Sequence, residues 1–404
     1  MEQLYARRRE DTGLALVRGE RARRDGERVS PRPAREVTRL DDGDGATAME
    51  MLVAGEPFVI HHPAFVASWR AAREIVTADG TVDIDKLEEL FGQAVVRVEE
   101  VSARADDDEA VDAQGAYGER PTRSMQVSEY ASWWRDRGKG ALLYLKDWHL
   151  TAEFPDFNTY TPPAIFSPDW LNEWYDHKRA GSDDVTARDY RFAYIGPAGS
   201  WTSMHSDVLR SSSWSTNVCG VKRWTLVPPD ATWALTSSTG RGIAPLLRTG
   251  CGESVDSAQF CALDIARAAS VVVIQQPGET IYVPPGWHHS VENLTDCLSI
   301  NHNWIHPSGA IDSVRLLLAE TEAAAAHIED VRLMVSASEF DALVDRNVAM
   351  NAGMGCAEFR DLLSRAEELA KHAAENAGND GDDGFVHELH ARWAREAREL
   401  LLSS

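Results

Sequence analysis

The sequence predicts a mainly β protein with helical flanks, and three observations support this. Between residues 141 and 305, short apolar runs alternate with turns rich in Pro and Gly, which is typical of an all-β barrel or sandwich. After residue 307, apolar residues recur at helical spacing along most of the chain. The glycine-rich phosphate-binding motifs of α/β folds do not occur, which argues against a nucleotide-binding α/β fold.

Residues 1–50 are rich in Arg, Asp, Gly and Glu and lack sustained periodicity, so we expect a flexible basic tail. The first 40 residues hold 11 arginines against 7 acidic residues. Transit peptides avoid acidic residues, so a targeting role is the weaker interpretation. The predicted main domain then covers residues 51–310, and a helical region covers residues 311–404.

Short elements precede the β-rich part of the main domain. Residues 58–60 form an apolar, strand-like run. Apolar residues at helical spacing predict helices over 65–76, 83–92 and 128–136. We therefore expect helices that support the N-terminal side of the β domain.

The predicted strands share β-branched and aromatic residues, and most end at Pro or Gly. They lie at 141–148, 191–197, 214–220, 222–229, 270–278, 280–287 and 297–304. Beyond them, helical patterns cover 310–334, 358–378 and 385–402. The C-terminal helices are expected either to pack on the barrel or to mediate a homodimer.

The composition restricts the classes of partner. The chain has 404 residues, of which 43% are hydrophobic and 26% charged, enough for a large core. No apolar run approaches the roughly 18 residues of a membrane span, so we expect no integral membrane segment. The net charge of −23 disfavours nucleic acid, whose phosphates attract basic surfaces. A basic or neutral protein partner fits better.

The five cysteines are scattered and form no C-x-x-C pair. We therefore expect neither a disulfide framework nor a structural zinc cluster, and a reducing compartment is the simpler interpretation. This predicts a cytoplasmic location, with the nucleus as the alternative.

One pair of polar residues suggests a metal site. His205 and Asp207 are two apart in a stretch that favours a strand, so both side chains point to the same face. A third ligand must come from an adjacent strand, and His288 and His289 follow a tight turn at Pro285. Two histidines and one carboxylate leave open positions on a metal, the arrangement of non-haem Fe(II) oxygenases.

Lys222 extends this hypothesis to a co-substrate. It lies 17 residues after His205, on the next predicted strand, beside Val221 and Trp224. Burying a lysine there is costly unless it meets an anion, such as the far carboxylate of 2-oxoglutarate. The alternative is a surface lysine next to Arg223.

The order of these motifs resembles the JmjC (jumonji-C) family of Fe(II)- and 2-oxoglutarate-dependent oxygenases. The resemblance runs from about residue 56 to 310. It is carried by H-x-D at 205–207, the lysine of "GVKRW" at 222, "PGETIYVPPGWHHSVENL" at 277–294 and "SINHNW" at 299–304. It implies a double-stranded β-helix, the jelly-roll barrel of cupin-like proteins.

The resemblance also implies roles for individual residues. The iron ligands would be His205, Asp207 and His289, because the family's last ligand falls two residues after the aromatic position held here by Trp287. The co-substrate 2-oxoglutarate would meet Lys222.

Further co-substrate contacts carried over from the family are Thr202, Tyr144 and Asn303. His302, between two asparagines, is expected to face away from the site. The implied cofactors are Fe(II), 2-oxoglutarate and O₂.

The activity implied by the resemblance is hydroxylation of a lysine side chain in a protein, such as a translation termination factor. H-x-D is the commoner motif among the hydroxylases of the family, whereas many demethylases carry H-x-E. The alternatives are a lysine demethylase, a cupin-like scaffold without activity, and a cupin metalloenzyme that does not use 2-oxoglutarate.

Overall fold

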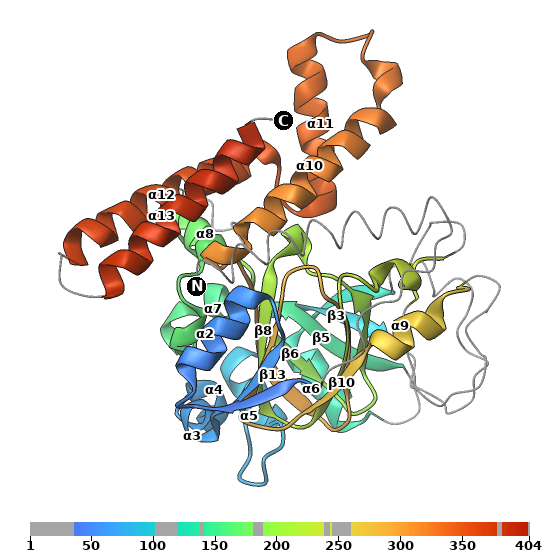
Figure 1. Ribbon diagram of the computed structural model, residues 1–404. Helices are drawn as coiled ribbons and strands as arrows, with labels where there is room; N and C mark the ends of the chain where they lie inside the picture. Colours follow the sequence, from blue (N-terminus) through green and yellow to red (C-terminus); the bar gives the residue numbers. More distant parts are fainter. Residues whose placement is uncertain are drawn as a thin grey trace.

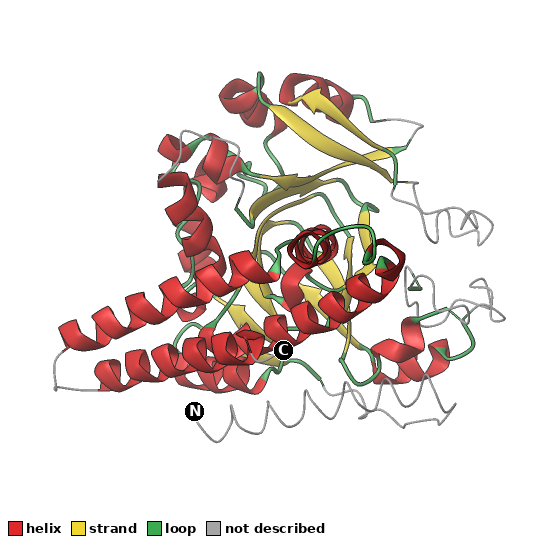
Figure 2. Ribbon diagram, turned by 90° about the horizontal axis from the view of Figure 1, so that it is seen from above, coloured by secondary structure: helices red, strands yellow, loops and turns green. Residues whose placement is uncertain are grey.

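The computed structural model describes residues 36–101, 120–137, 141–180, 189–237, 243–244, 260–377 and 382–402. Two sheets form its centre, with helices on the N-terminal and C-terminal sides (Figures 1 and 2). The acidic sequence "DDDE" at 106–109, whose composition predicts a solvated loop, and the N-terminal residues 1–35 lie outside the described residues.

The larger sheet has nine strands in the order β1-β2-β11-β8-β13-β6-β5-β3-β4. Its pairs are antiparallel except β1 with β2. In chain order the strands are β1 (Thr38–Asp41), β2 (Phe58–His61), β3 (Val95–Val101), β4 (Thr122–Gln126), β5 (Leu142–Trp148), β6 (Arg191–Gly196), β8 (Ser212–Cys219), β11 (Glu279–Val283) and β13 (Cys297–Trp304).

The smaller sheet has the order β10-β9-β12-β7 and is antiparallel throughout. Its strands are β7 (Trp201–His205), β9 (Lys222–Val227), β10 (Val271–Gln275) and β12 (His288–Asn293). Successive strands alternate between the two sheets, as β6 to β7 to β8 to β9 shows. This is the jelly-roll arrangement that the sequence predicted, and it places one short sheet against the middle of the other.

Most helices cover the outside of the larger sheet and one end of the barrel, whereas α9 lies beside the smaller sheet (Figure 1). Those before the barrel are α2 (Gly45–Ala54), α3 (Pro63–Ala67), α4 (Arg70–Glu74), α5 (Ile84–Phe91), α6 (Val127–Arg135), α7 (Leu150–Glu153) and α8 (Trp170–Ala180). Later ones are α9 (Leu263–Ala269), α10 (Ala310–His327), α11 (Ala337–Ala352), α12 (Cys356–Ala377) and α13 (Asp382–Leu402).

Two sequence-based expectations differ from the structure. The last part of the expected flexible tail over 1–50 is structured, because it contains β1 and the start of α2. The expected helix over 65–76 is two helices, α3 and α4, separated by extended backbone at Trp69 (φ −67°, ψ 143°). The indole of Trp69 is buried between Phe65 and Tyr160, so packing of this side chain overrides the helical pattern.

Helix α11 lies within the helical region expected over 311–404, but its own residues were not among the predicted helical patterns, although they carry the usual marks of a helix. Ser336 and Glu339 form a reciprocal capping box at its start. Phe340, Val344 and Val348 are spaced four apart and are buried, and Gly353 ends the helix at φ +94°. The polar residues between these positions hide the pattern.

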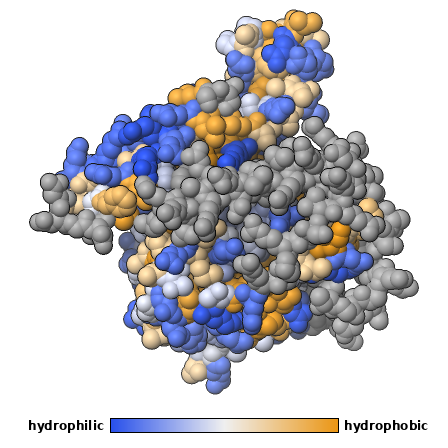
Figure 3. Space-filling view, viewed as in Figure 1, coloured by the Kyte–Doolittle hydropathy of each residue, from blue (hydrophilic) through white to orange (hydrophobic). Residues whose placement is uncertain are grey.

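The C-terminal helices form a separate hydrophobic cluster that also includes Leu209 of the barrel. In Figure 1, α12 and α13 lie side by side, and α10 with α11 projects away from the barrel. Apolar and polar surface alternate over this projection, at the top of Figure 3, and Leu333, Met334 and Met350 are exposed. A homodimer through these helices stays a prediction.

Candidate active site

Pairing of β7 with β12 brings two histidines from distant parts of the sequence together. The register places His205 directly opposite His289, with their ring centroids 4.3 Å apart. Asp207 lies two residues beyond His205, just after β7 ends. One ligand atom from each of His205, Asp207 and His289 lies within 4.8 Å of the other two. The three side chains can therefore bind one metal ion.

Backbone carbonyl groups orient both imidazole rings. Nδ1 of His205 lies 2.8 Å from the carbonyl oxygen of Ser203, and Nδ1 of His289 lies 3.4 Å from that of Trp287. A carbonyl oxygen only accepts hydrogen bonds, so in each ring Nδ1 carries the proton and Nε2 keeps its lone pair for a metal. Burial lowers the pKa of His289 to about 4, which keeps its ring neutral near pH 7.

The loop that follows Asp207 has an unusual backbone. Leu209 and Arg210 are consecutive non-glycine residues with positive φ, at 56° and 50°, a conformation that costs free energy and persists only when the surroundings hold it. The side chain of Leu209 is fully buried in the C-terminal helical cluster. The C-terminal helices therefore hold the segment that carries a metal ligand.

This contact leads to a prediction about Leu209. Leu209→Ala is expected to weaken metal binding, because the loop after Asp207 loses its anchor, and to destabilise the chain by about 2–5 kcal/mol. Leu363→Ala is the matched control, since Leu363 is equally buried in the same cluster. Metal titration and thermal unfolding measure both effects. Equal losses of metal affinity in the two variants would refute the anchoring role.

Lys222 lies inside the barrel. Its side chain is 2% exposed, so the alternative of a surface lysine is wrong. Nζ donates to Oγ of Ser299 on the facing sheet, at 2.7 Å, and no carboxylate among the described residues lies within ion-pair distance of it. Burial lowers the pKa of Lys222 to about 8. An ammonium group with three donors and one neutral partner is suited to binding an anion.

Other polar atoms in the barrel interior also lack partners. Register places Ser299 beside Asn217, and Asn301 beside Ser215, all on the face that carries the Lys222 contact. Oγ of Ser215 and the side-chain oxygens of Asn217 and Asn301 have no hydrogen-bond partner among the described residues. Buried polar atoms without partners are rare in folded proteins. The interior is thus a place where a polar ligand or water completes the hydrogen bonding.

The distance along the barrel between Lys222 and the metal ligand His289 suits a small dicarboxylate. Lys222 is paired with Asn293, four residues along β12 from His289. Four residues of strand span about 13 Å. This length accommodates the lysine side chain and a five-carbon dicarboxylate placed between the ammonium group and the metal ligands.

An irregularity in the β7–β12 pairing affects Thr202. His289 on β12 is paired with His205 on β7, and Val291 is paired with Thr202. His289 and Val291 are two residues apart, whereas His205 and Thr202 are three residues apart. Without this bulge Thr202 and His205 would point to opposite faces. With it, both occupy positions opposite inward-facing residues, so Thr202 lies between the metal ligands and the Lys222 end.

Tyr144 lies at the Lys222 end of the barrel. It is buried, and burial raises its pKa, so the phenol stays neutral and can donate a hydrogen bond. A β-carbon at Gly196 would fall 2.5–2.6 Å from atoms of Asn293, Ser200 and Tyr144. Only glycine therefore allows these side chains to meet beside Lys222.

The remaining sequence-predicted residues separate into two groups. Asn303 lies at the metal end, where Nδ2 donates to Oδ1 of Asp207 at 2.6 Å. His302 points to the other face of β13 and stacks on Trp214, with centroids 4.0 Å apart. His288 is paired with Val227 and alternates away from the face that carries His289. His289 therefore joins the ligand group, and His288 does not.

Sequence reasoning missed several residues of the site. Ser299, Asn301 and Asn303 alternate along β13 and line one face, but only Asn303 was singled out. The polar alternation in "SINHN" was the available signal, since a strand with one buried apolar face and one buried polar face borders a cavity. Asn293 and Leu209 gave no such signal.

The residues fit iron and 2-oxoglutarate. Two neutral imidazoles and one carboxylate on one side suit an Fe(II) ion with open positions. The buried ammonium group of Lys222, which has no carboxylate partner among the described residues, suits the far carboxylate of 2-oxoglutarate. None of the helices in the described part of the chain has the length and apolar character needed to cross a bilayer.

Comparisons with known proteins identify the family of the chain. A family profile described as "Cupin-like domain" matches residues 46–310. Arginine-specific demethylase JMJ20 of Arabidopsis thaliana is 34% identical, over 80% of this chain and 67% of that protein. The 2-oxoglutarate and iron-dependent oxygenase JMJD4 of Gallus gallus is 37% identical, over 64% of this chain and 56% of that protein.

JMJD4 of Homo sapiens is 34% identical, over 67% of this chain and 61% of that protein. The chain therefore spans roughly half to two thirds of the length of these relatives. Stretches such as "DYRFAYIGPAGSW" (189–201) and "SSWSTNVCGVKRW" (212–224) had suggested similarity to jumonji-domain-containing protein 4, and this is confirmed. The chain belongs to the cupin-like family and, within it, to the JmjC proteins.

Proposed function

We propose that this chain is an Fe(II)- and 2-oxoglutarate-dependent oxygenase that hydroxylates a lysine side chain of a protein, such as a translation termination factor. The observation that carries the proposal is the joint presence, inside one barrel, of the His205–Asp207–His289 group and the buried Lys222. The names of the JMJD4 relatives support the general reaction. The lysine target rests on the resemblance to that subgroup.

Each residue has a defined task in this reaction. The three ligands would hold iron on one side and leave the other side open. Lys222, with Thr202 and Tyr144 nearby, would bind the far carboxylate of 2-oxoglutarate. This would direct the other end of 2-oxoglutarate toward the metal. Bound iron supplies the oxidation, in which O₂ and 2-oxoglutarate yield succinate, CO₂ and one oxygen atom for a substrate C–H bond.

The apolar lining of the site supports chemistry of this kind. The walls around the ligands include apolar side chains of Trp224, Leu226 and Val291, which belong to the cluster between the sheets. Such walls exclude water from a reactive centre. The chain is strongly acidic, with a net charge of −23, and complementary charge speeds encounter with a basic segment of a protein substrate.

Demethylation is the second candidate, because the JMJ20 relative is named an arginine-specific demethylase and aligns over 80% of this chain. The two reactions share their oxidative step. Hydroxylation of an N-methyl carbon gives an unstable N–CH₂OH group, which releases formaldehyde and leaves N–H. Hydroxylation of a side-chain carbon gives a stable alcohol. The chemical identity of the C–H bond in the pocket decides between them.

Mass spectrometry of candidate substrates separates the two reactions. The full chain is incubated with Fe(II), 2-oxoglutarate and isotopically labelled O₂, together with unmodified and N-methylated basic peptides. We expect one labelled oxygen atom on a lysine of an unmodified peptide. Loss of a methylene unit with release of formaldehyde would assign demethylation instead. Absence of succinate formation with every substrate would refute the oxygenase proposal itself.

A further inference from the structure

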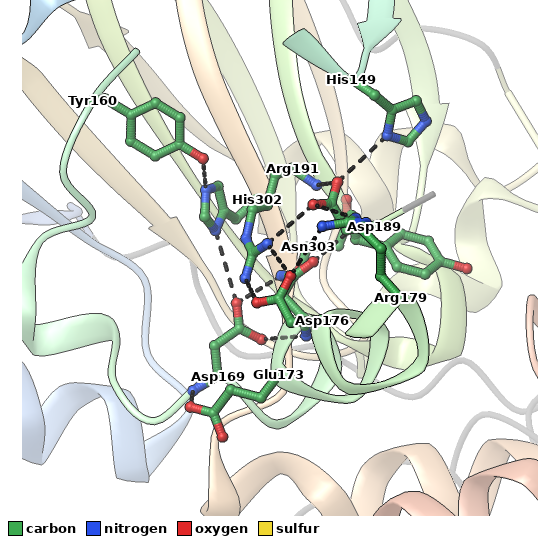
Figure 4. A network of polar contacts seen from close by, with 12 residues as sticks. His149, Tyr160, Asp169, Glu173, Asp176, Arg179, Asp189, Arg191, His302 and Asn303 are labelled. Carbon is green, nitrogen blue, oxygen red and sulfur yellow. Dashed lines mark hydrogen bonds and ion pairs between the residues drawn. The ribbon is translucent and has the colours of Figure 1, made fainter. Parts of the chain in front are cut away.

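A network of polar contacts connects helix α8 with the end of β13 (Figure 4). It contains ion pairs of Arg191 with Asp176 and Asp189, and a contact of His302 with Asp169 at 3.8 Å. Asp189 and His302 of this network are buried, whereas Asp176 is exposed, and Arg191 and His302 are paired on neighbouring strands β6 and β13. Asn303 is the member of this network whose side chain reaches the metal end of the barrel.

Hydrogen bonds hold Asn303 at its backbone N, its backbone oxygen and its side-chain Nδ2. Its backbone N donates to the carbonyl oxygen of Tyr190 at 3.0 Å, and its backbone oxygen accepts from Nδ2 of Asn172 at 3.0 Å. Nδ2 of Asn303 donates to Oδ1 of Asp207 at 2.6 Å, with a longer contact to Oγ of Ser211 at 3.4 Å. Both hydrogens of the amide therefore face neighbouring side chains and not the Lys222 end of the barrel.

Asn172 fixes the position of Asn303 from the side of α8. It is completely buried, and its Oδ1 accepts from the backbone N of Tyr190 at 2.8 Å. Its own Nδ2 also donates to Asp169 at 2.6 Å. Asn172 thus bridges the ends of the two adjacent strands β6 and β13, and its bond to the carbonyl oxygen of Asn303 restrains the backbone from which the Asn303 side chain extends.

The contact with Asp207 has a chemical consequence. The terminal torsion of an aspartate is soft and roughly two-fold, so an unrestrained carboxylate can present either oxygen, or both, to a metal. A donor on Oδ1 restrains this rotation and leaves Oδ2 as the free oxygen. Binding through one oxygen only preserves the open positions that the co-substrate and O₂ require.

The geometry points to Asn303 as a positioning residue for the metal ligand Asp207, held in place by Asn172, and not as the co-substrate contact that the family resemblance implied. This inference rests on the metal site of the proposed function. Hydrogen-bond partners of metal ligands are worth about 10- to 100-fold in metal affinity. Asn303 should therefore act on metal affinity, and Asn172 should act in the same direction through Asn303.

The test measures metal and co-substrate binding separately on the full chain. Co(II) is titrated without 2-oxoglutarate, followed by its ligand-field spectrum, and 2-oxoglutarate is then titrated at saturating Co(II). For Asn303→Ala we expect Co(II) affinity to fall about 10- to 100-fold, a changed Co(II) spectrum, and unchanged 2-oxoglutarate affinity. Asn172→Ala is expected to give a smaller loss of Co(II) affinity.

Two further variants control for folding. Asn303→Leu roughly keeps the volume of the side chain but removes the hydrogen-bond donor. It should therefore lower Co(II) affinity as Asn303→Ala does, without the cavity that the smaller side chain leaves at the strand end. Asn347→Ala removes a half-buried amide of α11, whose Nδ2 bonds the carbonyl oxygen of Leu343, and should leave Co(II) affinity unchanged.

The outcomes distinguish this inference from the proposed function. Unchanged Co(II) affinity together with weaker 2-oxoglutarate binding in Asn303→Leu would overturn the inference and restore the co-substrate role. A wild-type chain that binds Co(II) but never consumes 2-oxoglutarate would refute the proposed function, while the Co(II) comparison would still decide the role of Asn303. A wild-type chain that binds no Co(II) would overturn both.

Discussion

Replacing Asp207 by alanine is expected to abolish both metal binding and 2-oxoglutarate turnover. Asp207 supplies the only carboxylate of the three-residue group, and two neutral imidazoles alone hold a divalent ion weakly. The loss of metal affinity should exceed the roughly 10- to 100-fold attributed to partners of a ligand. Titration with Co(II) and measurement of succinate formation check the two effects independently.

Asp207→Glu is the matched variant for this prediction. It keeps the charge but lengthens the side chain, so the carboxylate moves away from Nδ2 of Asn303, which now lies 2.6 Å from Oδ1. We expect the metal affinity of Asp207→Glu to lie between that of the wild type and that of Asp207→Ala. Asp207 is only half-buried, so neither variant should unfold the chain. Wild-type metal affinity in Asp207→Ala would exclude this residue as a ligand.

Replacing Lys222 by methionine is expected to weaken 2-oxoglutarate binding on the order of a hundredfold or more, because a buried carboxylate would lose its charged partner. Metal affinity without 2-oxoglutarate should not change, since Lys222 lies at the other end of the barrel. Binding of 2-oxoglutarate at saturating Co(II), measured by calorimetry, checks this.

Arg223→Met provides the control for the lysine variant. Arg223 is adjacent in sequence but exposed, and it contacts Glu292 at 3.3 Å on the outer face of the sheet. Its loss should leave 2-oxoglutarate affinity unchanged. An equal effect of the two substitutions would show that general positive charge, and not the buried ammonium group, attracts the co-substrate.

The same lysine predicts a pH dependence. Burial lowers the pKa of Lys222 from 10.5 to about 8, so the ligand-free chain loses the ammonium proton as the pH rises through 8. Binding of a carboxylate needs that proton. The affinity for 2-oxoglutarate should therefore be constant below pH 8 and fall above it, by up to about tenfold per pH unit. Lys222→Met should remove this slope.

The stability of the ligand-free chain depends on pH in the opposite direction to its affinity for 2-oxoglutarate. Between pH 8 and 10.5 the folded, ligand-free chain binds fewer protons at Lys222 than the unfolded chain, so the free energy of unfolding rises with pH in this window. Below pH 8 the folded chain bears the full cost of a buried charge. Lys222→Met is therefore expected to stabilise the ligand-free chain at neutral pH, on the order of 3 kcal/mol. Denaturant unfolding measures the change.

Much of the barrel was predictable because each strand carries its own local pattern. The runs that became β5, β6, β8 and β9 show apolar, β-branched and aromatic residues that end at turn residues. The spacing of His205 and Asp207 predicted a shared face for the same reason. The start and end of helix α11 are marked by local signals, the capping box and Gly353, which the apolar spacing alone does not include. The break at Trp69 was not predictable from local pattern, since packing against Tyr160, distant in sequence, decides it.

The sequence by itself determined which residues could form the metal site and the co-substrate pocket, because the motifs around His205, Lys222 and His289 identify the family. Only the tertiary structure decided how they are used. The bulge in the β7–β12 pairing turns Thr202 inward, and the end of β13 places Asn303 on Asp207. Leu209 ties the ligand loop to the C-terminal helices. Each of these depends on pairing or packing between segments far apart in the chain, and local sequence does not encode such register and contact.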